Sequence, residues 1–266
     1  MLLRNVFTKT IRDLRWPTFW VALGMGAMTG YFAVLFPTYS KVVNLEDILA
    51  KMGPAAKLMG ANAGDASSLI GFLHIELFSM ILPALIIAFT AGMASGFTAG
   101  EESRGTIDVL LSYPVSRRRL ILEKSLAVTL ASVLAAVVVW VFAVSGAAAS
   151  GSVLPGDKLA AALVMLVLLG LVFGALALAI SAWSGNRGAA IGLAIGLMVV
   201  MYLSDALANI VDGLKVLQPL SMFHYYMGSD PLRNGLNLAD AALLAVVTIV
   251  LLVVSLVAFD RRDLAA

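Results

Sequence analysis

The chain carries the run LAAALVMLVLLGLVFGALALAISA at residues 159–182, and no charged side chain interrupts it. An apolar stretch of roughly 20 residues is long enough to cross the hydrocarbon core of a bilayer as a helix. The run is rich in Ala, Leu and Gly, is far longer than a strand, and lacks the alternation of a transmembrane β-barrel. It therefore predicts a membrane-spanning helix.

Further apolar runs of similar length lie on both sides of this one. Together they predict six spans, at about 17–37, 75–97, 120–147, 159–182, 189–211 and 239–259. Hydrophobic residues make up 61% of the chain and mean hydropathy is +0.97, which excludes a soluble globule. We expect one all-α, polytopic membrane domain over residues 1–266. The absence of cysteine excludes disulfides and thiol chemistry.

Positive charge is unevenly divided between the two sides that these spans define. With the N-terminus inside, twelve of the 18 Lys and Arg residues fall on the inner side. They are Arg4, Lys9, Arg12, Arg15, Arg104, Arg117, Arg118, Arg119, Lys124, Arg187, Arg261 and Arg262. Because positive loops stay in the cytosol, both termini are expected there. Basic residues spread along a membrane face also argue against nucleic-acid binding.

The first residues have the pattern of an amphipathic helix. Over residues 2–16, apolar side chains recur at helical spacing, with basic residues largely elsewhere around the turn. This pattern favours a helix lying in the inner interface before the chain enters the membrane at Pro17. The alternative is a basic anchor that only sets topology.

Glycine and proline predict how the spans pack and bend. Small residues recur four positions apart, and such pairs let membrane helices approach closely. The main series are Gly26 and Gly30, Gly170 and Gly174, and Gly188, Gly192 and Gly196. Pro83 lies inside the second expected span and predicts a kink there.

Charge is concentrated in one internal segment, TAGEESRGTIDVLLSYPVSRRRLILEK, at residues 98–124. Ile107, Leu110 and Leu111 fall on one face of a short helix by their spacing. Glu101 and Glu102 stand at its start, where negative charge is favoured. The pattern favours a segment that docks into a groove on a cytosolic partner. The alternative is a basic loop that only fixes topology.

Short motifs in this segment resemble one known family. EESRGT occupies residues 101–106, LLS 110–112 and PVSR 114–117, and Lys124 opens the next span. A further match is PLSMFHYY at 219–226, between the last two spans. These motifs are similar to those of permease subunits of ABC-2 type transporters, which have six spans and both termini inside. The resemblance covers nearly the whole chain.

The resemblance implies a specific function and specific partners. The chain would form the substrate path of an ATP-driven exporter in a plasma membrane of prokaryotic type, as a homodimer or with a close paralogue, in contact with membrane lipids. A separate ABC ATPase chain would bind ATP and Mg, and this chain would bind no cofactor or metal. Within segment 98–116, coupling to that ATPase would fall on Glu101, Glu102, Arg104, Gly105, Thr106, Ile107, Asp108, Leu110 and Leu111.

Polar residues near the outer ends of the spans are candidates for the substrate path. Tyr202, Asp205 and Asn209 lie close to one helix face and would line an outer vestibule, or they simply end the span at headgroup depth. His74 and Glu76, at the outer start of the second span, are either a gating contact or an interfacial pair. The aromatic stretch 212–238, which includes His224, predicts short helices at the outer interface.

Two rival functions compete with transport by an ABC system. A CAAX-type membrane protease needs EExxxR and FxxxH, but Arg104 follows Glu102 by two positions, and Ile70 and Leu220 replace the phenylalanines. A stand-alone secondary transporter or channel would usually show charges in the middle of its spans, and none occur here. No GxxxxGK[ST] motif occurs either, since the glycine-rich turn at 185–188 lacks its spacing and lysine, so the chain has no P-loop of its own.

Overall fold

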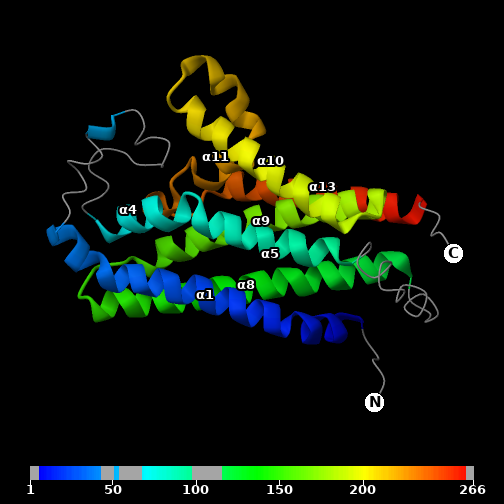
Figure 1. Ribbon diagram of the computed structural model, residues 1–266, viewed down its shortest axis with the longest axis horizontal. Helices are drawn as coiled ribbons and strands as arrows, with labels where there is room; N and C mark the ends of the chain where they lie inside the picture. The colour runs from blue at the N-terminus through cyan, green and yellow to red at the C-terminus, as the bar shows by residue number, and fades with distance from the viewer. Residues whose placement is uncertain (1–5, 43–50, 54–67, 98–115, 262–266) are drawn as a thin grey trace.

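The computed structural model describes residues 6–42, 51–53, 68–97 and 116–261, and every regular element within these ranges is a helix (Figure 1). The long helices are α1 (Val6–Val42), α5 (Ile81–Ser95), α8 (Arg117–Ala149), α9 (Gly156–Ser184), α10 (Arg187–Ala208) and α13 (Leu238–Arg261). The short ones are α4 (Leu69–Leu73), η1 (His74–Phe78), η2 (Asp212–Leu220), α11 (Met222–Met227) and α12 (Pro231–Asn234).

The membrane-spanning potential follows the apolar runs of the sequence. Five single helices are long and apolar enough to cross a bilayer: α1, α8, α9, α10 and α13. Leu69–Phe78 and α5 meet the same criterion only when taken together, as a pair bent by 43°. The expected all-helical architecture is confirmed, with six spans if the bent pair counts as one.

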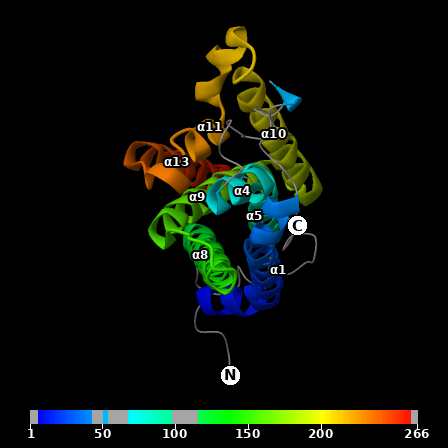
Figure 2. The same ribbon diagram turned by 90° about the vertical axis from the view of Figure 1, so that its left-hand side faces the viewer.

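The run at 159–182 becomes the central helix of the bundle. α9 packs against α5, α8, α10 and α13. Of the 18 residues that form its candidate membrane-crossing stretch, 72% are buried inside the protein. Figure 2 shows it between α8 and α13 with α5 alongside. An all-round apolar helix is therefore enclosed by protein, whereas α10 and α13 leave most of their apolar surface outside.

Glycines place two helix pairs in close contact. A Cβ at Gly146 of α8 would lie 2.6 Å from the carbonyl oxygen of Gly30 in α1. A Cβ at Gly170 or Gly174 of α9 would meet Ile86 or Thr90 of α5 at 2.9 and 3.0 Å. The Thr90 hydroxyl is 2.6 Å from the Gly170 carbonyl oxygen, to which it donates. Small residues thus let the backbones of α1 and α8 touch, and let side chains of α5 pack directly on the backbone of α9.

The first helix differs from expectation. Residues 6–16 are helical as predicted, but they run without interruption into the first span as part of α1. Pro17 lies inside this helix, where it removes one backbone hydrogen bond and its ring crowds the carbonyl four residues earlier. Membrane helices tolerate such prolines, and α1 continues through Pro17 as one helix, so the interfacial position of residues 2–16 stays a prediction.

The second span bends as predicted, but earlier in the chain than Pro83 itself. The α-helix gives way to the π-helical turn η1 and resumes at Ile81, after the break at Ser79 and Met80. Pro83 cannot donate to the carbonyl four residues before it, that of Ser79, and its ring clashes with that group. The span also begins at Leu69, six residues before the expected start, because α4 and η1 continue it.

Candidate functional site

The end of α5 and the start of α8, which flank residues 98–115, lie at one end of the bundle together with the start of α1 and the end of α13. The backbone N–H of Phe7 donates to the Glu123 carboxylate at 3.0 Å, and the Arg118 guanidinium pairs with Asp260 at 2.8 Å. These contacts join the start of α1 and the end of α13 to the start of α8. The start of α1 and the end of α13 both lie on the right in Figure 1, at the same end of the bundle as the end of α5 and the start of α8.

The end of α5 is fixed at this same place by three side chains from three other helices. Arg187 donates to the Gly92 carbonyl at 3.0 Å, and Ser181 donates to the Ser95 carbonyl at 2.8 Å. Lys124 approaches the carbonyl oxygen of Phe97 at 3.5 Å. We call Lys124, Ser181 and Arg187 the α5 clamp.

The chemistry of a helix end explains the α5 clamp. The last four carbonyls of a helix have no partner within it. Here α10 and α9 supply donors to two of them, those of Gly92 and Ser95, and α8 places Lys124 near the Phe97 carbonyl just beyond the helix. Lys124 is only 5% exposed, and its ammonium stands 5.3 Å from the centre of the Phe97 ring. The end of α5 is therefore in polar contact with three other helices.

The predicted coupling residues lie outside the described residues, in 98–115. The structure instead shows that the α5 clamp holds the carbonyls of Gly92, Ser95 and Phe97, which come just before residue 98 in the chain. The sequence offered a weak signal for Arg187, a lone cation in a tight turn, and none for Ser181, a hydroxyl inside an apolar run.

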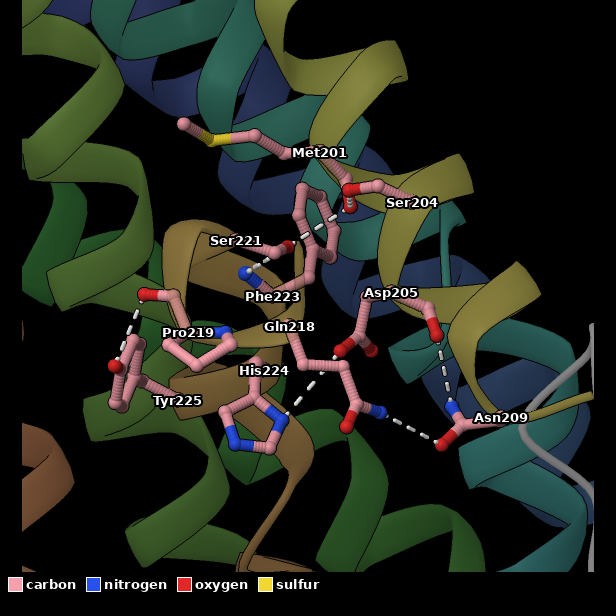
Figure 3. Close-up of polar contacts among 10 residues, drawn as sticks. All are labelled: Met201, Ser204, Asp205, Asn209, Gln218, Pro219, Ser221, Phe223, His224 and Tyr225. Carbon is pink, nitrogen blue, oxygen red and sulfur yellow. Dashed lines mark hydrogen bonds and ion pairs between the residues drawn. The ribbon is translucent and has the colours of Figure 1, made fainter. Parts of the chain in front are cut away.

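The opposite end carries the polar cluster drawn in Figure 3. Asp205 and His224 face one another across α10 and α11, with Oδ1 and Nδ1 3.5 Å apart. That distance is longer than a hydrogen bond, and the buried Asp205 Oδ1 has no hydrogen-bond partner. Asn209 donates to the Asp205 carbonyl at 3.1 Å and accepts from Gln218 at 3.1 Å. The contact between Asp205 and His224 is a long polar contact in a partly covered site, and it is an ion pair only when His224 is protonated.

The predicted stripe of Tyr202, Asp205 and Asn209 thus lies against the segment 212–227. The Tyr202 ring packs edge-on against Phe223, with centroids 5.5 Å apart. Ser221 donates to the Met201 carbonyl at 2.8 Å and accepts from the backbone N–H of Phe223, fixing the start of α11 on α10. Short helices are present in this segment, as the sequence predicted.

A buried tyrosine that sequence reasoning missed joins this cluster to the bent span. Tyr226 is completely buried, and its hydroxyl donates to the Phe78 carbonyl at 3.1 Å. Burial raises the pKa of this hydroxyl well above its ordinary value, so it remains a neutral donor. His74 and Glu76 lie in the same π-helical turn that Tyr226 caps. Within the described ranges, no three His, Asp or Glu side chains are placed to bind a metal ion.

The fold and these two polar ends define a polytopic helical membrane protein. The family model described as ABC-2 family transporter protein matches residues 5–264. The chain therefore belongs to the ABC-2 transporter family, and the resemblance read from its motifs is confirmed. No curated protein matches the chain closely enough to count as a relative. Membership supports a membrane transport subunit rather than an enzyme, and an ABC ATPase as the general kind of partner.

Proposed function

We propose that this chain is the permease subunit of an ATP-driven exporter whose ATPase is a separate polypeptide. The family match over nearly the whole chain carries the proposal. It is supported by the absence from the sequence of the Gly-Lys pair that a P-loop requires. In this assignment the end bearing the α5 clamp and both chain ends faces the cytosol, in agreement with the distribution of Lys and Arg.

The proposed contact with the ATPase is made by residues 98–116. Glu101 and Glu102 would meet basic or amide groups of the ATPase, and Ile107, Leu110 and Leu111 would fill an apolar groove on it. The position of the α5 clamp supports this role, because Ser181 bonds to the carbonyl of Ser95, only three residues before the segment starts. Movement of the docked segment would then reach α8, α9 and α10 through α5.

The test is a double substitution, Leu110→Asp with Leu111→Asp, in the full chain co-expressed with its ATPase. Burying a leucine completely is worth ~1.5–3 kcal/mol, so two buried charges should abolish co-purification of the ATPase or substrate-stimulated ATP hydrolysis. Val153→Asp with Val216→Asp is the matched control, because Val153, between α8 and α9, and Val216, in η2, are both over 80% exposed at the opposite end. Normal assembly and transport by the Leu110–Leu111 variant would exclude this segment as the coupling element.

We further propose that two copies, or two paralogues, enclose the substrate path with α10 at the interface. A methyl group added at Gly192 or Gly196 would meet no heavy atom of the described residues within 4 Å. Leu193 and Val200 on the same helix are 59% and 62% exposed. Such an open, small-residue face lets a second helix approach closely. Tyr202, Asp205 and Asn209 would line the outer part of that path.

The chain lacks cysteine, so single cysteines introduced at positions 192–202 can report this interface by crosslinking. The competing face is α13, where Val246 and Ile249 are 57% and 60% exposed. Crosslinks between copies along α10 but not at 246 or 249 support the proposal, and the reverse pattern contradicts it. Direction is tested in inside-out vesicles, where an exporter accumulates its substrate when ATP is added outside.

A further inference from the structure

A cavity of about 250 Å³ opens beside the α5 clamp. It is lined by residues from four helices, including Thr10 and Asp13 of α1, Gly92 and Met93 of α5, Lys124 of α8 and Arg187 of α10. A single water needs only ~15 Å³ of such space, whereas sites for drug-sized ligands span about 300–1,000 Å³. The cavity thus has room for a head group and not for a whole large ligand.

The charges that face this cavity have a net positive sign. Arg187 and Lys124 are the cations, and Asp13, exposed on α1, is the single acid among the lining residues. Arg187 uses its Nη2 for Gly92, but its Nε is buried without a hydrogen-bond partner. A buried charged donor without an acceptor is costly, and an anion in the cavity supplies the acceptor.

The rest of the lining is apolar. Leu14, Pro17, Met93 and Phe97 surround the cations, and the Thr10 hydroxyl already donates to the Val6 carbonyl. Guanidinium and ammonium groups bind phosphate and carboxylate through charge-assisted hydrogen bonds. A ligand that combines one such anionic group with an apolar body satisfies both parts of the lining.

We propose that this cavity binds the anionic head group of an amphiphile at the inner end of the substrate path. Its place on a substrate path rests on the proposed function, but the binding itself needs no ATPase. Two sources share this chemistry: a phospholipid of the surrounding membrane, and a transported anionic amphiphile. In either case the bound anion touches the same arginine that fixes α5, so occupancy is communicated to the end of the helix that leads to residues 98–116.

Because the chain has no cysteine of its own, a single introduced cysteine can report the sign of the electrostatic potential in the cavity through its reaction with charged reagents. Met93→Cys places a thiol on the cavity lining, and Val153→Cys, at an 86% exposed position, calibrates the intrinsic reactivity of each reagent. Full-length protein in phosphatidylcholine vesicles is treated with methanethiosulfonates bearing a sulfonate, a trimethylammonium or a plain methyl group. Clefts of one sign concentrate the opposite ion by roughly tenfold or more, so the sulfonate reagent should react preferentially at Met93→Cys by about that factor.

Substitution of the cations should remove this preference. Adding Arg187→Gln is expected to lower the sulfonate preference severalfold, and Arg187→Lys should preserve it. The methyl reagent reports whether the thiol remains equally accessible in each variant. The decisive quantity is the ratio of sulfonate to trimethylammonium labelling at Met93→Cys, divided by the same ratio at Val153→Cys. If this value is one or less in the protein with intact Arg187, while the methyl reagent reacts normally, the proposal is overturned.

Protection experiments identify the ligand class and its source. Dodecyl phosphate should slow methyl labelling of Met93→Cys, whereas dodecyltrimethylammonium at the same concentration should not, and equal protection by both contradicts an anion site. If reconstitution in phosphatidylglycerol vesicles slows labelling of Met93→Cys without any dodecyl phosphate, the ligand is a resident lipid. Protection that requires dodecyl phosphate, together with stimulated ATP hydrolysis by the permease–ATPase complex, identifies cargo. Protection by dodecyl phosphate without its ATP-driven transport would leave the anion site in place and exclude this compound as cargo, whereas the exporter assignment itself is tested separately in the inside-out vesicles.

Discussion

Gly146→Ala tests whether backbone contact between α1 and α8 is essential to the bundle. A methyl group at this position would lie 2.6 Å from the Gly30 carbonyl oxygen, 3.1 Å from the Ala33 Cβ and 3.2 Å from the Gly30 Cα. Two of these atoms belong to backbone, which cannot rotate away as a side chain would. The helices must separate by about 0.4 Å simply to reach the 3.0 Å below which real Cβ contacts are not found.

The expected cost is that of overpacking a well-packed core, about 1–3 kcal/mol. Alanine is also the better helix former by about 1 kcal/mol, which works in the opposite direction. Gly24→Ala in α1 separates the two effects, because a methyl group there meets nothing among the described residues within 4 Å. Both variants share the change in helix propensity, so their difference isolates the steric clash.

The measurement is thermal unfolding of the purified protein in detergent, followed by tryptophan fluorescence. For a chain of this size, each kcal/mol corresponds to about 2–4 °C, so Gly146→Ala should melt several degrees below Gly24→Ala. Equal melting temperatures, or a more stable Gly146→Ala, would refute the claim that α1 and α8 touch through their backbones.

Three further substitutions test individual contacts. Thr90→Val removes the donor to an α9 carbonyl, and its free energy of unfolding in a denaturant titration should fall by about 0.6 kcal/mol, the average for hydrogen bonds between membrane helices. Thr29→Val is the control and should cost less, because the Thr29 hydroxyl bonds within its own helix. Tyr226→Phe leaves a buried carbonyl without its donor and should cost about 1–3 kcal/mol. Tyr225→Phe removes a solvent-exposed hydrogen bond to the Pro219 carbonyl and should cost less, because water replaces the lost donor. Arg187→Gln should reduce transport more than basal ATP hydrolysis, Arg187→Lys should partly restore it, and parallel loss of both activities would contradict a role in coupling.

In the bent pair formed by Leu69–Phe78 and α5, a local sequence rule predicts the bend but not the structure on its far side. Pro83 predicts a kink from covalent geometry alone, and a break occurs four residues earlier, at the carbonyl that its ring obstructs. The rule does not say how the chain continues beyond the break. The π-helical turn His74–Phe78 extends the span to Leu69, and the buried Tyr226 hydroxyl, 148 residues away, bonds to its last carbonyl. That long-range contact is not encoded in the hydropathy of either segment.

The sequence by itself determined the class of this protein, because hydropathy and charge are local quantities. The run at 159–182 is long and apolar enough to be a spanning helix wherever it packs, and the motifs at 101–117 and 219–226 indicate the family. Only the tertiary structure decided which helix became central and which side chains fixed the end of α5. Ser181 and Ser95 are separated by 86 residues, and Phe7 and Glu123 by 116. Their meeting depends on the rotation and crossing of whole helices, which arise from the summed packing of many side chains and not from any one segment.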